Sequence, residues 1–168
     1  MKLYLLRHAI AVESADWSSD DESRPLTDVG IIKMRQGAKN IAKLIPALDI
    51  IITSPLVRAQ QTAALVSASY PPKKLPKLLI SNNLAPGSRV FSLQEELGQY
   101  PDSSKIMLVG HQPNLGDLLG YFVSGNQRVH IPLKKGGLAY IEAPQAEALG
   151  QLEWLLTAKQ LRSLATIT

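Results

Sequence analysis

The stretch Leu3-Tyr4-Leu5-Leu6-Arg7-His8 decides the fold class, because a short apolar run passes directly into two polar residues that can carry chemistry. Four consecutive apolar residues are typical of a strand that is buried on both faces of a parallel sheet. Two further runs have the same character, one at 49–53 with three consecutive isoleucines and one at 106–109. Each run is followed by a helical pattern, so strands alternate with helices along the chain.

The remaining segments extend this alternation. Thr27 is the expected N-cap of a helix whose apolar residues recur at helical spacing and which ends at Pro46. Ser54-Pro55 is expected to start a second helix, with a capping hydroxyl followed by proline at the first helical position. Further strands are expected at 77–80, 129–131, 137–142 and 152–156, and further helices at 88–97, from 114 to about 123, and at 158–165.

The alternation predicts an α/β fold, a three-layer α/β/α sandwich with a mostly parallel sheet to which the last strands add an antiparallel edge. The 168 residues allow one domain with a sizeable core but not two full domains, so we expect a single domain over residues 1–168. Apolar residues make up 45% of the chain and charged residues 19%, a globular mixture that excludes disordered, collagen-like and coiled-coil chains.

Several classes of function are excluded by what the sequence lacks. Without cysteine there are no disulfides, thiolate metal sites or cysteine nucleophiles. The three histidines, His8, His111 and His130, contain no pair at ligand spacing on one helix, so we expect no bound metal. Arg7 and His8 interrupt the first apolar run too early for a signal peptide, and no run approaches the roughly 20 residues of a membrane span. We therefore expect a soluble, cytoplasmic protein.

The net charge of +4 does not indicate a nucleic-acid partner. Lysine and arginine are dispersed, and aromatic residues, at 5% of the chain, are too few for a base-stacking platform. Acidic residues instead gather in one polar segment between Glu13 and Glu22. This distribution favours a surface that binds an anion at one place over a surface that binds along a polyanion such as a nucleic acid.

Four side chains are expected to meet at the carboxyl ends of the strands, where open α/β sheets bind their ligands. Arg7 and His8 follow the first strand, Arg58 lies in the first turn of the helix after the second, and His111 follows the strand at 106–109. A histidine at a strand end is by itself more often structural. Chance placement of all these residues at three strand ends is, however, a weaker explanation than a shared anion site.

Arg58 has two interpretations that the sequence leaves balanced. A cation in the first helical turn faces the positive end of the helix dipole, at a cost of about 0.3–1 kcal/mol. A bound anion between the two would offset that cost, because helix N-termini and guanidinium groups both bind phosphate. Alternatively, Arg58 points away from the terminus and pairs with a surface carboxylate.

These residues resemble a known family. Leu5-Leu6-Arg7-His8-Ala9 is similar to the signature of the histidine phosphatase (phosphoglycerate mutase-like) superfamily, although that superfamily usually has glycine where Ala9 stands. The segments 24–30, 54–62 and 109–113 resemble its other motifs, in the same order, so that the resemblance covers roughly residues 1–125. The chain length and the Arg24-Pro25-Leu26-Thr27 motif are most similar to the SixA-type phosphohistidine phosphatases.

The resemblance implies a phosphoglycerate mutase-like fold and covalent catalysis without metal or cofactor. Neutral His8 would attack phosphorus and form a phosphohistidine, which water then hydrolyses. Arg7, Arg58 and a protonated His111 would bind the transferring phosphoryl group. We therefore predict that His8, Arg7, Arg58 and His111 are catalytic and that the last three bind substrate.

Many relatives use a carboxylate to protonate an alkoxide leaving group, and this sequence does not place one. The candidates fit by residue type alone, and each is also explained as a surface charge or a helix cap: Glu13, Glu95, Glu96, Asp102 and Asp117. A phosphohistidine needs no such acid if its ring leaves as neutral imidazole. The short stretch between Leu65 and Gly110 also leaves little room for a lid over the pocket.

We therefore predict a protein phosphohistidine phosphatase that acts on a phosphorylated histidine phosphotransfer domain in two-component signalling. The alternatives are a small-molecule phosphomonoesterase or mutase of the same superfamily, and a non-catalytic phosphate-binding module. Arg24 either reaches the phosphate or pairs with Asp20 or Asp21, and His130 is expected to be structural.

Overall fold

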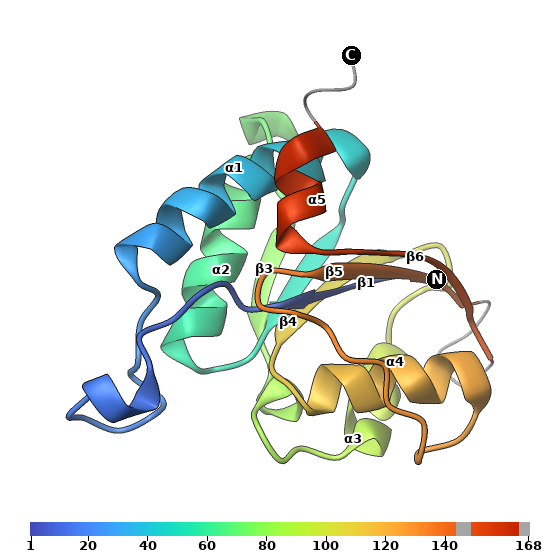
Figure 1. The fold of residues 1–168 in the computed structure, drawn as a ribbon. Helices are drawn as coiled ribbons and strands as arrows, with labels where there is room; N and C mark the ends of the chain where they lie inside the picture. The colour runs from blue at the N-terminus through green and yellow to red at the C-terminus, as the bar shows by residue number, and fades with distance from the viewer. Residues whose placement is uncertain (144–148, 165–168) are drawn as a thin grey trace.

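The computed structural model describes residues 1–143 and 149–164, which contain a six-stranded sheet with helices on both faces (Figure 1). The strand order is β3-β2-β4-β1-β5-β6. β1 and β2 are each parallel to β4, and β3 is parallel to β2, whereas β5 runs antiparallel to β1 and β6 antiparallel to β5. The predicted α/β class and antiparallel edge are confirmed. The strands are β1 (Lys2–Arg7), β2 (Ile50–Thr53), β3 (Lys77–Ile80), β4 (Lys105–Gly110), β5 (Leu138–Glu142) and β6 (Gln151–Leu156).

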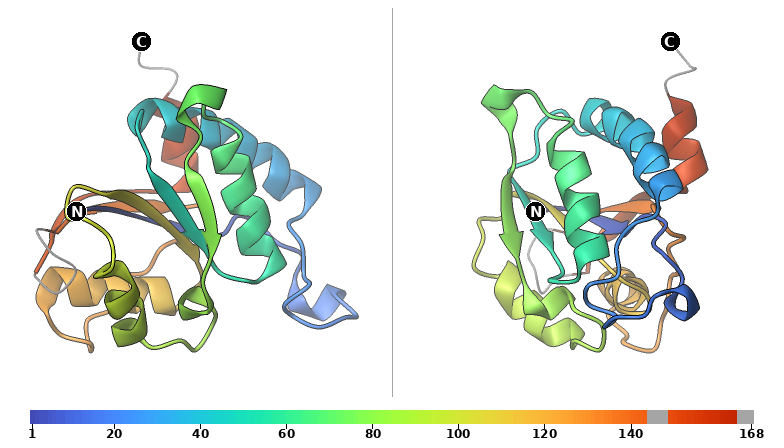
Figure 2. Two further views of the ribbon diagram at one scale, coloured as in Figure 1. Left: turned by 180° about the vertical axis from the view of Figure 1, so that it is seen from behind. Right: turned by 90° about the vertical axis from the view of Figure 1, so that its left-hand side faces the viewer.

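The helices divide between the two faces of the sheet. One face carries α1 (Asp28–Leu44), α2 (Val57–Ser67) and α5 (Ala158–Ser163), and the other carries α3 (Val90–Leu97) and α4 (Asn114–Ser124). Figure 2 shows the same separation from behind and from the side. Among the described residues, no helix is both long enough and apolar enough to cross a membrane.

Alternate residues of the central strands enter two separate cores. Leu6 and Met107 pack among residues of α1 and α2, whereas Leu5 and Leu108 pack among residues of α3 and α4, and all four are fully buried. Burial of one such side chain contributes about 1.5–3 kcal/mol. Coverage on both faces explains why the central strands are uninterrupted apolar runs rather than alternating patterns.

The helix boundaries agree with the sequence at α1 and differ at α2. Thr27 is the N-cap of α1, because its hydroxyl accepts a hydrogen bond from the amide of Gly30 at 3.0 Å. The predicted start of α2 at Ser54-Pro55 is wrong, since the helix begins at Val57 and its N-cap, Leu56, has no side-chain cap. Ser54 is instead fully buried at the end of β2, where its hydroxyl contacts His111.

The predicted strand at 129–131 is wrong as well, because this segment is irregular. The amide of Ile131 donates to the carbonyl of Gly116 at 3.0 Å, so the segment lies along α4 rather than on the sheet. A Cβ added at Gly120 would lie 1.8 Å from the carbonyl oxygen of Val129, which shows how closely the two backbones pack. The last predicted helix ends at Ser163, and Ala165 lies outside the described residues.

Gly30 and Gly37 on α1 provide a matched test of how closely this helix packs against its neighbours. A Cβ on Gly30 would lie 2.0 Å from the carbonyl oxygen of Ile10, whereas a Cβ on Gly37 would meet only Leu161, at 4.0 Å. We expect Gly30→Ala to lower the free energy of unfolding by about 1–3 kcal/mol, as overpacking does. Gly37→Ala should leave it unchanged or raise it by about 0.5–1 kcal/mol. Urea unfolding of both variants measures the difference, and equal stabilities would contradict the close approach at Gly30.

Candidate active site

The register of the parallel strands brings three residues from distant parts of the chain to one edge of the sheet. Arg7 at the end of β1 pairs with Gly110 at the end of β4, and the amide of His8 donates to the carbonyl of Gly110 at 3.0 Å. On the other side of β4, the amide of Ser54 donates to the carbonyl of Val109 at 2.9 Å. His8, Ser54 and His111 therefore leave adjacent strands at the same end.

The two predicted histidines lie against each other. The ring centroids of His8 and His111 are 5.1 Å apart with an interplanar angle of 51°, and the residues are 6% and 3% exposed. Two titratable rings are thus held together out of solvent, at the strand ends where α/β proteins bind ligands. His130 lies outside this pair, and its Nδ1 is 2.7 Å from a carboxylate oxygen of Asp117 near the surface.

His8 is held as a neutral ring with one defined tautomer. Its Nδ1 is 2.7 Å from the carbonyl oxygen of Ala9, which can only accept, so Nδ1 carries the proton and Nε2 has a free electron pair. Burial lowers the pKa of His8 to about 4, and the positive charges of Arg58 and Arg7 lower it further against the opposing effect of the Ala9 hydrogen bond. An imidazole with this pKa is unprotonated at neutral pH.

Ala9 takes the usual glycine position of the superfamily motif without backbone strain. No described non-glycine residue has a positive φ, so the conformation at Ala9 is one that alanine adopts freely. The Ala9 amide donates to the hydroxyl of Thr62 at 3.0 Å, and that hydroxyl donates to the carbonyl of Arg58 at 2.7 Å. Thr62 therefore fixes the chain beyond His8 to the first turns of α2.

His111 is also buried and neutral in the free protein. Its Nε2 is 2.8 Å from the hydroxyl oxygen of Ser54. Burial lowers the pKa of His111 to about 3, with further contributions from His8 and Arg58. The protonated His111 that the family resemblance implies is therefore not its state in the free protein, although a nearby phosphoryl group would raise this pKa.

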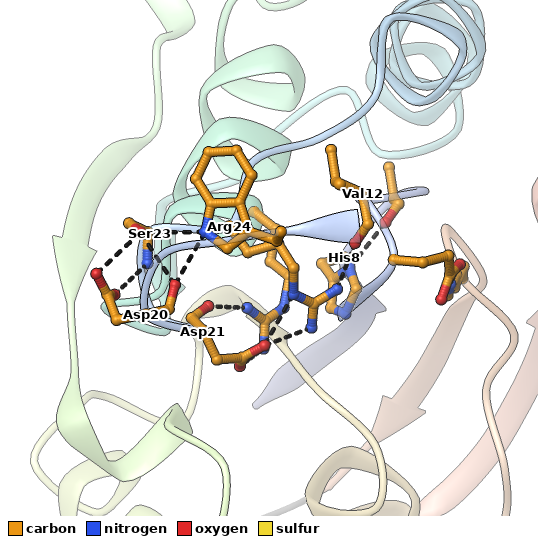
Figure 3. Close-up of polar contacts among 11 residues, drawn as sticks. His8, Val12, Asp20, Asp21, Ser23 and Arg24 are labelled. Atoms are coloured by element: carbon orange, nitrogen blue, oxygen red, sulfur yellow. Dashed lines mark hydrogen bonds and ion pairs between the residues drawn. The ribbon is translucent and has the colours of Figure 1, made fainter. Parts of the chain in front are cut away.

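Arg58 combines features of both predicted interpretations. It pairs with a carboxylate, that of Asp21, but its side chain is 4% exposed instead of pointing into solvent. Its Nη1 donates to the Asp21 carbonyl oxygen at 2.7 Å and its Nη2 to Oδ2 at 2.8 Å. Arg24 approaches the other carboxylate oxygen, with Nε and Nη2 2.8 and 2.7 Å from Asp21 Oδ1, while its Nη1 donates to the Val12 carbonyl (Figure 3).

Three buried side-chain nitrogens have no hydrogen-bond partner among the described residues: Nε of Arg7, Nε of Arg58 and Nδ1 of His111. Arg7 otherwise donates through Nη1 to the Leu133 carbonyl at 2.8 Å. Each unpaired buried polar group costs about 1–3 kcal/mol, so folded proteins contain few of them. All three belong to the four predicted site residues.

Asp21 contacts a candidate site residue, Arg58, whereas the sequence indicated it only as a possible partner of Arg24. Burial raises the pKa of its carboxyl, but hydrogen bonds from Arg24 and Arg58 outweigh this effect and hold the pKa below its usual value. Asp21 is therefore a carboxylate at neutral pH and a poor proton donor. The signal in the sequence is its spacing, since Asp21 precedes Arg24 by three residues and can pair with it locally.

The five acids considered from the sequence are each either paired with another side chain or exposed to solvent. Glu13 accepts from Lys135 at 2.8 Å, Glu96 accepts from Asn83 at 2.8 Å, and Asp117 contacts His130. Glu95 and Asp102 are exposed. Among the residues that the structure describes, no group of three or more His, Cys, Asp or Glu side chains is arranged to hold a metal ion.

Comparison with known proteins identifies the class to which this fold and this histidine pair belong. Residues 3–79 match the family model of the histidine phosphatase superfamily (branch 1). Over 141 residues the chain is 36% identical to an uncharacterized protein of Picosynechococcus sp., with 82% of each chain covered. The protein is a member of the histidine phosphatase superfamily.

Solved structures with the same fold include enzymes with different substrates. The protein histidine phosphatase SixA complexed with tungstate has a TM-score of 0.82 at 22% identity, covering 96% of this chain and 99% of that one. The alpha-ribazole phosphatase from Shigella flexneri has a TM-score of 0.76 at 20% identity, covering 94% of this chain and 97% of that one. At these identities the similarity establishes the shared fold, not the substrate.

The lowered pKa values of His8 and His111 predict that acid destabilises the protein already at pH values above those at which carboxylates titrate. Between the ordinary histidine pKa of about 6.5 and the folded values, the unfolded chain binds protons that the folded chain excludes. The free energy of unfolding should therefore fall from about pH 7 to about pH 5, by roughly 2 kcal/mol per histidine at about 1.4 kcal/mol per pH unit.

Denaturant unfolding across this pH range measures the effect. The control is the His8→Asn/His111→Asn double variant, whose stability should depend much less on pH. Equal pH dependence in both proteins, or imidazole NMR signals of His8 and His111 that titrate at the ordinary histidine pKa, would contradict the buried neutral pair.

Proposed function

We propose that this protein is a SixA-type phosphohistidine phosphatase that removes the phosphoryl group from a phosphorylated histidine on another protein. The observation that carries the proposal is the set of three unpartnered buried nitrogens on Arg7, Arg58 and His111, next to the neutral His8. A phosphoryl group offers several acceptor oxygens, so one bound there would supply the missing partners.

His8 has the properties of the nucleophile. Because Nδ1 is committed to the Ala9 carbonyl, the electron pair on Nε2 is available for in-line attack on phosphorus. The same hydrogen bond stabilises the positive charge that the ring gains as the N–P bond forms. The low pKa keeps the ring neutral before attack.

Arg7, Arg58 and His111 surround the transferring group as donors. Phosphoryl transfer depends mainly on positioning and on stabilisation of charge on the phosphoryl oxygens. If the Ser54 hydroxyl donates to His111 Nε2, the neutral His111 ring carries its proton on Nδ1, the nitrogen without a partner. The negative phosphoryl group then favours uptake of a second proton by His111.

The reaction balances in two displacements. Nε2 of His8 forms a bond to phosphorus as the substrate's N–P bond breaks, and the electron pair stays on the substrate imidazole, which leaves neutral if its other nitrogen carries a proton. Water then attacks the phosphohistidine of His8, the N–P bond electrons return to Nε2, and inorganic phosphate leaves as H2PO4− with both protons of the water. The exchange between two imidazoles is close to isoenergetic.

The surroundings of the site favour a phosphohistidine over a phosphate ester. An alkoxide leaves poorly without a proton donor, and Asp21, the carboxylate that pairs with Arg58, stays ionised at neutral pH. The chain between α2 and β4 forms β3 at the edge of the sheet, short helices at Pro72–Lys74 and Asn82–Leu84, and α3, and these elements leave no long insertion to cover a pocket. A site without such a cover suits a phosphoryl group presented by a folded domain, for which we propose a histidine phosphotransfer domain of a signalling relay.

A small-molecule phosphomonoesterase is the second candidate, because the alpha-ribazole phosphatase from Shigella flexneri has nearly the same fold. It requires that another group protonate the leaving oxygen. A non-catalytic phosphate-binding module is the third candidate, and it gives no role to the unprotonated Nε2 of His8.

Release of phosphate from a histidine phosphotransfer domain phosphorylated on histidine tests the proposal. We expect the wild-type protein to release phosphate and His8→Gln to be slower by a factor of about 10³ or more, as is usual when a nucleophile is removed. His130→Gln, which changes the surface histidine, should retain activity. Rapid quenching should trap an acid-labile phosphoenzyme in the wild type only.

Each rival gives a different result in this assay. Unchanged release by His8→Gln would contradict the nucleophile assignment. Faster turnover of sugar or nucleoside monophosphates than of the phosphorylated domain would favour the phosphomonoesterase. Phosphate binding without any phosphoenzyme would favour the binding module.

A further inference from the structure

Asp21 makes ionic and hydrogen-bond contacts with Arg58, an arginine of the proposed phosphoryl site, and with the neighbouring Arg24. One carboxylate oxygen accepts from Arg58 and the other from Arg24, and the Asp21 backbone carbonyl accepts from Arg58 as well. Figure 3 shows the Asp21 side chain directed toward Arg24. This arrangement resembles an oxyanion held by two arginines, with the anion supplied by the chain itself.

The two sides of the contact differ in burial. The Arg58 side chain is 4% exposed and that of Arg24 is 14% exposed, whereas the Asp21 side chain is 51% exposed. A buried guanidinium is costly to leave without a counter-charge, so the arginines need an anion in the free protein. Asp21 supplies it from the solvent side, where rotation of one side chain would remove it.

Neighbouring contacts hold the backbone at Asp21 in place without using its carboxylate. The Glu22 carbonyl accepts from the amide of Val57 at 2.9 Å, and Asp20 accepts from the amide of Ser23 at 2.8 Å. The loop can therefore keep its position while the Asp21 side chain moves. A carboxylate and a phosphoryl group are both oxyanions, and their like charges oppose simultaneous binding at Arg58 and Arg24.

We propose that Asp21 is a specificity-determining residue, whose carboxylate in the free protein occupies on Arg58 a position that a phosphoryl oxygen takes in the complex. This inference rests on the proposed phosphoryl site but not on the identity of the substrate. Free phosphate must displace Asp21 to bind fully, so its affinity is low and the product leaves readily. A phosphorylated protein meets the same competition but gains further contacts outside the site.

Two roles are possible for the Asp21 carboxylate: it competes with the bound anion, or it only positions Arg58. The two roles predict opposite effects of removing the charge of Asp21. If Asp21 competes, Asp21→Asn destabilises the free protein, because a buried guanidinium loses its partner, and strengthens anion binding, because the anion then restores the pairing. If Asp21 only orients Arg58 for the substrate, the same change weakens anion binding. The sign of the change in affinity therefore decides between the two.

The test is calorimetric titration of the full chain with inorganic phosphate and, separately, with tungstate. We expect Asp21→Asn to lower the dissociation constant about tenfold or more, and the phosphate-induced rise in Tm to be larger than in the wild type.

Glu22→Gln is the matched control, because Glu22 is the adjacent exposed acid and its side chain has no hydrogen bond or ion pair among the described residues. It removes one charge from the same loop and should change the affinity less than threefold. Asp21→Glu keeps the carboxylate and should bind phosphate as weakly as the wild type.

Unchanged or weaker phosphate binding by Asp21→Asn would overturn the competition. If Asp21→Asn does not fold, Asp21→Ser replaces it and the same comparison applies. Absence of phosphate and tungstate binding in all variants would contradict the phosphoryl site itself. Because binding is measured without turnover, an unchanged Asp21→Asn affinity leaves the proposed phosphatase reaction intact, and a failed phosphatase assay leaves a tenfold change in affinity standing.

Discussion

The pairing of β1 and β2 with the two sides of β4 is the constraint on which the site depends. These parallel strands end together, so the hydrogen bonds from His8 to Gly110 and from Ser54 to Val109 are continuations of the sheet. A shift of one residue in either register would turn alternate side chains to the opposite face of the sheet. The two apolar cores oppose such a shift, because each central strand buries side chains on both faces.

This constraint brings the charged guanidinium groups of the arginines and the neutral histidine rings together in a place that solvent hardly reaches. Burial at this edge of the sheet, together with the nearby charge of Arg58, lowers the pKa of His8 to about 4, which keeps the proposed nucleophile uncharged. The same proximity costs stability, since Arg7, Arg58 and His111 each leave a buried nitrogen unpaired. Such a loss of local stability is common at functional sites.

The sequence predicted the central strands well and the surface segments less well, for physical reasons. A strand buried on both faces needs an unbroken apolar run, so 49–53 and 106–109 had few other interpretations. The apolar residues at 129–131 fitted an edge strand equally well, but the glycines of α4 let that segment pack on the helix. The hydroxyl of Ser54 fitted a helix cap by type, whereas in the fold it contacts His111.

The positions of the candidate residues on strand ends and helix starts were predictable because the sheet fixes them, whereas for Asp21 the sequence indicated only a local pairing with Arg24. Its position depends on how an irregular loop folds back on α2, and its composition resembles that of any acidic surface loop. Arg58 shows the corresponding limit, since its place in the sequence supported a bound anion and a carboxylate partner equally. Its two interpretations are compatible if a carboxylate of the chain occupies an anion site.

The proposed phosphoryl site and the proposed substrate preference therefore have different physical origins. His8, the two site arginines and His111 are placed by the strand register, and the chemistry they support is the same for any phosphoryl donor. Preference among donors must come from groups that act on the leaving group or on anion affinity. Here Asp21, the carboxylate that pairs with Arg58, is held ionised by Arg24 and Arg58, so it cannot assist an alkoxide. A donor whose leaving group brings its own proton is the one that such a site serves best.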